Sequence, residues 1–269
     1  MLDCMRLLRP LALAALVASL CACSDNPDTK EIADKPAESL YNQGFNALQA
    51  GAVTDAAKFF EEVERQHPYS ALAPQAEIMA AYSYYRGNLY DDAINALDHF
   101  IDLHPGNKNA PYAYYLKALC YYEQIQDVRR DQKITEQALD ALTEVVNRFP
   151  GTAYARDASL KLDLTRDHLA GKDMDIGRYY ENQQQYLAAI NRFRRVVENY
   201  QTTSHVPEAL ERLTECYLAL GVTDEAQTAA AVLGYNYPGS SWYEASYDLL
   251  KGKHLEPKKS SGSWLSNIF

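Results

Sequence analysis

The sequence has little positive charge and no run of basic residues. Lys and Arg together number 26 against 36 Asp and Glu, so the formal net charge is −10. Proteins that bind nucleic acid gather Lys and Arg on one face, because they must neutralise phosphates. The missing run argues against nucleic acid as a partner. It equally argues against adhesion to an anionic membrane by charge alone.

Cysteine is also scarce, and the common catalytic and metal-binding motifs are missing. Beyond residue 23 only Cys120 and Cys216 remain, and they fit either packing or pairing in an oxidising compartment. The six histidines show no metal-ligand spacing, and there is neither a Cys-x-x-Cys nor a His-Glu-x-x-His motif. Neither a glycine-rich phosphate loop nor a Gly-x-Ser-x-Gly motif is present. These absences predict a protein that is not an enzyme and uses no metal and no cofactor.

The one long apolar run lies near the N-terminus. Arg6 and Arg9 precede an apolar stretch over residues 11–20, followed by small residues up to Cys23. This pattern is typical of a secretory signal peptide over residues 1–22, too short to remain as a membrane span. An ordinary secreted protein with a cysteine at its cleavage site is the alternative.

The end of this segment, Leu20-Cys21-Ala22-Cys23, resembles a bacterial lipobox. In that motif the signal peptidase cuts before the last cysteine, which then carries the lipid chains. Several acyl chains together form a stable anchor where one would not, so Cys23 is predicted to be lipidated. The residue after it is Ser24 rather than Asp, which resembles the pattern for sorting to the outer membrane. We therefore expect a lipid-anchored protein on the periplasmic face of that membrane.

An internal repeat organises the rest of the chain. Prolines end helix-like segments, and an alanine stands twelve residues before each of them: Pro68, Pro105, Pro150 and Pro238 after Ala56, Ala93, Ala138 and Ala226. A period of 34 residues with small, aromatic and Pro positions at fixed offsets resembles the tetratricopeptide repeat. Five copies fit residues 37–70, 74–107, 111–152, 170–203 and 207–240. The prediction is an all-α protein, a right-handed α-solenoid of about five helix pairs.

The remaining segments complete the expected domain organisation. Residues 23–36 are a lipidated tether, residues 37–250 form the solenoid, and residues 251–269 are a flexible tail with an apolar end. The third repeat has an insertion in the region 126–133, and residues 153–169 lengthen the first helix of the fourth repeat, with a kink at Gly171. The exposed apolar residues Trp264, Leu265, Ile268 and Phe269 suggest a tail that either docks on a partner or folds back on the last helix.

The first helix of each repeat lines the concave groove of such a solenoid. In the N-terminal repeats this register predicts a mostly aromatic groove made of Tyr41, Phe45, Ile78, Tyr82, Tyr85, Arg86, Tyr112, Tyr115 and Tyr122. Tyrosine combines a large rigid ring with a hydrogen-bonding tip, which suits an extended peptide of mixed sequence, and Arg86 suits a carboxylate. The same positions in the C-terminal repeats are mostly polar and acidic. Alternatively, many of the tyrosines only pack between helices.

Several short segments go beyond the generic repeat. They are Ala-Tyr-Ser-Tyr-Tyr85, Phe-Ile-x-Leu-x-Pro105, Asp157-Ala158, and Tyr179-Tyr180 followed by Ala188-Ala189-Ile190-Asn191-Arg192. With the lipobox and the five repeats, they resemble the BamD family of outer-membrane β-barrel assembly lipoproteins, over nearly the whole chain beyond the signal peptide.

This resemblance implies a non-enzymatic scaffold that works beside the barrel protein BamA and accessory lipoproteins. It implies that the N-terminal repeats receive unfolded outer-membrane proteins. It also implies that the C-terminal repeats contact a periplasmic domain of BamA, with Asn191 and Arg192 at that contact. The family often has Arg near the Phe-Ile-x-Leu segment, where His99 and Asp102 stand here. A different tetratricopeptide lipoprotein, such as a pilus secretin pilotin or a cell-wall coordination factor, is the alternative.

Overall fold

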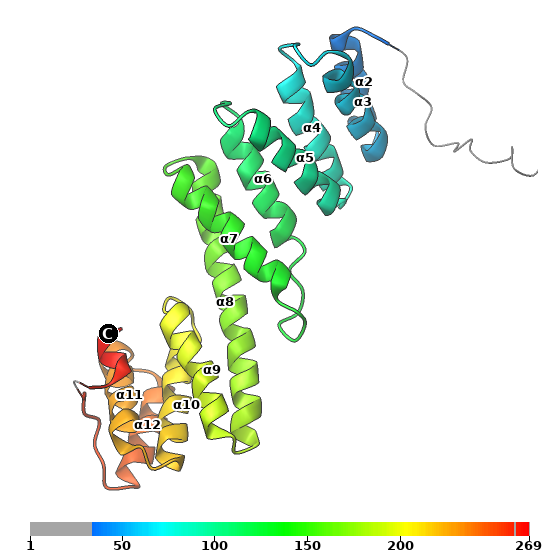
Figure 1. Ribbon diagram of the computed structural model, residues 1–269. Helices are drawn as coiled ribbons and strands as arrows, with labels where there is room; N and C mark the ends of the chain where they lie inside the picture. Colours follow the sequence, from blue (N-terminus) through cyan, green and yellow to red (C-terminus); the bar gives the residue numbers. More distant parts are fainter. Residues whose placement is uncertain (1–33, 261, 269) are drawn as a thin grey trace, which may run out of the picture. The chain divides into compact units, whose positions relative to one another are not determined.

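The computed structural model describes residues 34–260 and 262–268. The predicted signal peptide, Cys23 and most of the tether lie outside these residues. From Ala37 onward the chain forms consecutive helix hairpins, and Figure 1 shows them following one another in sequence order. The pairs are α2 (Ala37–Gln49) with α3 (Val53–Gln66), α4 (Ala73–Arg86) with α5 (Tyr90–Leu103), α6 (Ala110–Tyr122) with α7 (Lys133–Arg148), α8 (Ala153–Asn182) with α9 (Tyr186–Asn199), and α10 (Val206–Ala219) with α11 (Thr223–Asn236).

Two short elements follow these pairs, α12 (Ser241–Lys251) and the 3₁₀ helix η1 (Trp264–Asn267). Each helix packs mainly on its neighbours in the sequence. The hydrophobic core is accordingly divided into successive clusters along the chain, as expected when each repeat contacts only the next one. The described part of the chain contains helices and no strand, which confirms the predicted α-solenoid of tetratricopeptide-type pairs.

Small residues allow the two helices of a pair to approach closely. In the first pair, a Cβ atom added to Gly44 would lie 2.9 Å from the ring of Phe60. In the fourth pair, a Cβ on Gly177 would lie 2.4 Å from the ring of Phe193. Both rings are fully buried. The recurring small and aromatic positions of the sequence are therefore the two sides of one packing contact.

The turns within the pairs also repeat. Gly51 and Gly221 have φ angles of 79° and 76°, a left-handed conformation that glycine adopts without a steric penalty. The equivalent turns of the second and fourth pairs place Asn88 and Gln184 in the same region, at 57° and 59°. The shared conformation explains why the loops within these pairs are equally short.

Helix α8 departs from the regular repeat, because it is 30 residues long. It begins after Thr152, whose Oγ1 accepts a hydrogen bond from the amide of Ala155 at 3.1 Å. The segment 153–169 and the first helix of the fourth repeat thus form one helix. The helix is continuous through Gly171, the position at which the sequence predicts a kink. The insertion of the third repeat lies in the α6–α7 loop, residues 123–132.

The C-terminal segment differs from the flexible tail that the sequence predicts. The amide of Lys258 donates to the carbonyl of Gln227 at 3.1 Å, and Trp264 Nε1 donates to the hydroxyl of Tyr217 at 3.1 Å. Leu265 has 0% exposure and belongs to the C-terminal core cluster. The apolar end folds back on the solenoid, with η1 beside α11 (Figure 1) rather than mainly on the last helix, α12. Removal of apolar side chains from water explains why this segment packs.

Candidate functional site

The predicted N-terminal groove begins on α2. The ring of Tyr41 contacts the ring of Phe60 edge-on, with centroids 5.3 Å apart. Its hydroxyl accepts a hydrogen bond of 2.9 Å from Gln75 on α4, which links the first two pairs. Phe45, one turn further along α2, is 44% exposed. Phe45 therefore offers apolar surface that nothing in the described chain covers fully.

Four of the predicted groove residues come together with a fifth tyrosine that the sequence analysis missed. The rings of Tyr82 and Tyr85 on α4 lie 6.5 Å apart. Tyr112 and Tyr115 on α6 flank Tyr154 on α8, with centroids at 5.6 and 5.4 Å. We call these five residues the tyrosine cluster. Tyr154 was missed because it lies in the added segment 153–169, which has no place in the repeat register.

Burial favours the neutral form of the phenol groups of Tyr85, Tyr112 and Tyr115. Burial raises the pKa of Tyr112 to about 12. Burial also raises the pKa of Tyr115, whose hydroxyl donates a hydrogen bond to Asp157 on α8. Asp157 in turn pairs with Lys161 at 2.8 Å. The cluster is thus an uncharged surface with polar tips, fixed in position by contacts between α4, α6 and α8.

The other predicted groove residues have different environments. Ile78 is only 5% exposed and packs in the core with Leu97 and Phe100, so its assignment to the groove is wrong. The register places it on the first helix of its pair, but its side chain lies in the core cluster shared by α4, α5 and α6. Tyr122 is partly buried, with the Lys161 ammonium 5.5 Å from its ring centroid. Arg86 is exposed, 3.2 Å from the Tyr82 hydroxyl, and forms no ion pair within the described chain.

A second site surrounds Arg192, in the region of the predicted partner contact. A cavity of about 430 Å³ lies between the α6–α7 loop, α8 and α9. We call it the basic pocket, and it is lined by Arg129, Arg130, Asp131, Gln132, Glu136, Leu169, Lys172, Asp173, Ile176, Arg192, Arg195 and Tyr200. Five of these side chains carry positive charge and three are acidic. The excess of positive charge stands out in a chain whose net charge is negative.

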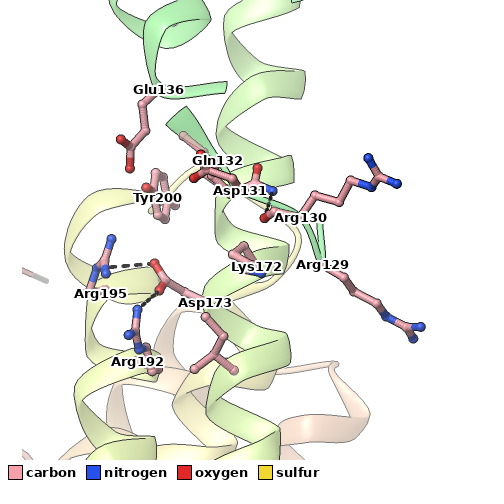
Figure 2. Close-up of a pocket in the computed structure, with 12 residues that line it drawn as sticks. Arg129, Arg130, Asp131, Gln132, Glu136, Lys172, Asp173, Arg192, Arg195 and Tyr200 are labelled. Atoms are coloured by element: carbon pink, nitrogen blue, oxygen red, sulfur yellow. Dashed lines mark hydrogen bonds and ion pairs between the residues drawn. The ribbon is translucent and has the colours of Figure 1, made fainter. Parts of the chain in front are cut away.

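A buried carboxylate organises the floor of the basic pocket. Asp173 on α8 is 3% exposed. Arg192 donates to one of its oxygens at 3.1 Å, and Arg195 lies 3.4 Å from the other. Figure 2 shows both guanidinium groups turned toward Asp173, whereas Arg129 and Arg130 extend away from it. One negative charge therefore holds two cations at the pocket wall, and their remaining N–H groups can meet an anion. Asn191, the other predicted contact residue, is exposed beside Arg192.

The acidic positions predicted for the C-terminal groove form an internal network. Arg212 lies between four carboxylates, with the nearest at 3.4 Å on Glu181. Arg178 bonds Glu208 at 3.0 Å. Burial raises the pKa of Glu211 to about 7. These ion pairs link α8 to α10 within the protein, so the acidic groups are already engaged and are less available to a ligand.

Cys120 and Cys216 are free and buried in separate core clusters. Burial raises the pKa of Cys120 to about 12 and also raises that of Cys216. Neither is a thiolate near neutral pH, so both act as packing residues. In the part of the chain that the structure describes, no helix is long and apolar enough to cross a membrane.

Comparison with known proteins identifies the family. The family model described as outer membrane lipoprotein matches residues 33–233. The outer membrane protein assembly factor BamD of Caulobacter vibrioides is 52% identical over 244 residues, covering 91% of this chain and 80% of that protein. BamD of Rickettsia prowazekii is 47% identical over 246 residues, covering 91% and 97%. The chain belongs to the BamD family. Among solved structures, a thermophilic tetratricopeptide-repeat protein of Thermus thermophilus aligns with a TM-score of 0.37 at 19% identity, covering 78% and 98%.

Membership in the BamD family agrees with the resemblance seen in the sequence. The relatives are named as outer membrane protein assembly factors, which are members of a non-enzymatic family. The family relation favours this function over the alternative of a pilotin or a cell-wall coordination factor. The chain is thus a protein of the outer-membrane assembly system.

Proposed function

We propose that the chain is a lipid-anchored, non-enzymatic scaffold of the β-barrel assembly machinery, with two separate docking sites. The supporting observation is that one solenoid carries two chemically different surfaces. The tyrosine cluster lies on α4, α6 and α8, and the basic pocket lies between the α6–α7 loop, α8 and α9. Helix α8 contributes to both. A scaffold that holds a substrate near a partner needs two such sites on one rigid element.

The tyrosine cluster is the proposed site for unfolded outer-membrane proteins. An extended chain exposes alternating side chains and peptide groups. Tyrosine rings contact the former, and their hydroxyl groups bond the latter. Phe45 adds exposed apolar surface, and the guanidinium of Arg86 stands beside Tyr82 without a carboxylate partner in the described chain. This combination suits a substrate segment with an aromatic residue near a carboxylate.

The basic pocket is the proposed contact with a BamA-type barrel protein, with accessory lipoproteins as further partners. Asp173 already orients Arg192 and Arg195. Their guanidinium groups therefore lose little further conformational freedom when they bind an acidic side chain of the partner. Asn191 is exposed on the same helix turn and provides an amide for hydrogen bonding. The lipid on Cys23, which lies outside the described residues, is the proposed anchor to the periplasmic face of the outer membrane.

The direct test is purification of the full-length lipoprotein from its own membranes in mild detergent, followed by mass spectrometry of the partners. We expect a large barrel protein with repeated periplasmic domains as the main partner. Arg192→Glu removes a guanidinium from the pocket and should abolish co-purification of that partner. Arg166→Glu is the matched control, because it makes the same charge change on α8 outside the pocket lining.

The opposite results separate the alternatives. If Arg192→Glu co-purifies the barrel protein as well as the wild type, the pocket is not the contact. If a secretin or only cell-wall proteins are recovered with the wild type, the chain serves a different lipoprotein scaffold. Circular dichroism spectra of both variants must match that of the wild type for the comparison to count.

A further inference from the structure

A cluster of carboxylates and imidazoles lies where α3, α4 and α5 meet. Glu64 on α3, Glu77 on α4 and His99 on α5 each offer one ligand atom, and these three atoms lie within 4.8 Å of one another. His99 Nδ1 is 3.8 Å from Glu64 Oε1. None of the three belongs to the tyrosine cluster or to the basic pocket. The proposed function therefore gives this cluster no role.

Glu77 is the unusual member of the cluster. It is only 6% exposed, and its Oε1 lies 3.0 Å from His104 Nε2. Its other oxygen, Oε2, is buried and has no hydrogen-bond partner in the structure. A buried carboxylate oxygen without a partner is costly, because folding removes its water and replaces it with nothing. The carboxylate of Glu64 lies close by and adds electrostatic repulsion.

We propose that Glu64, Glu77 and His99 bind one Zn²⁺ ion, with a water molecule as the fourth ligand. A divalent cation here would cancel the repulsion between the two glutamates and give the buried carboxylate a partner. His104 would orient Glu77 through their hydrogen bond, as residues hydrogen-bonded to metal ligands commonly do. Imidazole favours zinc over calcium and magnesium, which prefer six or more oxygen ligands.

The geometry allows this coordination with small side-chain movements. Tetrahedral zinc with bonds of about 2.0–2.2 Å places its ligand atoms about 3.4 Å from one another. The three atoms are at most 4.8 Å apart, so they must approach by somewhat more than an ångström. The His99 side chain is 55% exposed and that of Glu64 32%, which leaves both free to rotate toward the buried Glu77. The ion would tie the first helix pair to the second.

The consecutive spacing of residues does not reveal such a site, since its ligands come from three different helices. No local metal-binding motif is present in the sequence for that reason. In the repeat architecture, both α3 and α5 pack against α4, and side chains of α3 and α5 reach each other there. Residues 13 and 22 positions apart in the sequence are thereby brought to one point.

The test uses the full-length protein in detergent, stripped with EDTA and then given Zn²⁺ alone. Equilibrium dialysis should find one zinc per chain at this site. Zinc at about a hundredfold excess over its Kd should raise the melting temperature by about 5–10 °C, and Mg²⁺ should not. His99→Ala and Glu77→Gln should weaken zinc binding at least tenfold. His254→Ala is the matched control, because it removes a histidine outside the cluster and should bind zinc like the wild type.

His99→Ala and Glu77→Gln are both expected to fold, since His99 is largely exposed and Glu77→Gln removes a buried charge. If Glu77→Gln fails to fold, Glu64→Gln at a partly exposed position replaces it in the comparison. The proposal is wrong if the wild type binds no zinc, or if the variants bind it as the wild type does. An equal effect of Mg²⁺ would overturn the assignment to zinc.

Discussion

The contact between Gly177 and Phe193 allows a sharp test of the repeat packing. Substitution of Gly177 by Ala adds one methyl group at a point where Cβ would lie 2.4 Å from Phe193 Cε1. In a helix interior, Ala is favoured over Gly by about 0.8–1.0 kcal/mol. Overpacking of a core costs about 1–3 kcal/mol. Because a separation of 2.4 Å is far below van der Waals contact and the ring is fully buried, we take the upper end of that range.

The two effects together predict that Gly177→Ala lowers the stability by about 2 kcal/mol. For a domain of this size, that corresponds to a fall in melting temperature of about 4–8 °C. Gly171→Ala in the same helix is the matched control. There the nearest heavy atom, His205 Nε2, would be 3.4 Å from the new Cβ. The helix preference for Ala then dominates, and the melting temperature should rise by about 2–4 °C.

Thermal melts followed by circular dichroism at 222 nm measure both variants. The reasoning is refuted if Gly177→Ala raises the melting temperature as Gly171→Ala does. A double variant checks the cause of the loss. Phe193→Leu removes the ring that meets the new methyl group, so Gly177→Ala should cost much less in that background. A loss of the same size with and without the ring would place the clash elsewhere.

Three further predictions follow from buried residues. Ala56→Leu should overpack the first helix pair and cost about 1–3 kcal/mol in urea unfolding, since Ala56 has 0% exposure; an unchanged midpoint would contradict the register of that repeat. Leu265→Ala should release the C-terminal segment and speed its cleavage by trypsin after Lys258 or Lys259, whereas equal cleavage rates would mean that the segment is not packed. The pKa of Glu211 is raised to about 7, above its usual value. Its stabilising contribution is therefore complete below about pH 4.5 and is lost as the pH rises through 7. Glu211→Gln should flatten the stability curve over that range, and an unaltered curve would show that Glu211 titrates normally.

The sequence predicts the repeats well because their packing is local. A small residue, an aromatic residue and a closing proline recur at fixed spacing, and each describes a contact inside one helix pair or with the next pair. Gly44 against Phe60 and Gly177 against Phe193 are such contacts. The same locality explains why the tyrosines of α4 and α6 were predicted to share a face. Ile78 fails the prediction because the register assigns a helix face but not how deeply the surrounding helices cover it.

The basic pocket shows where reasoning from the register ends. Of the residues that line the pocket, only Arg192 was predicted as a contact residue, through the family resemblance. The lining also includes Arg129 and Arg130, which come from an insertion that the regular repeat does not contain. It further needs Asp173, which a sequence reader would place on an ordinary solvated helix face. The structure instead buries Asp173 and pairs it with two arginines. Irregular parts of the solenoid, namely the long α8 and the long α6–α7 loop, thus build the surface that distinguishes this protein from a plain repeat array. The proposed partner contact lies there because regular repeats alone offer no such concentration of positive charge.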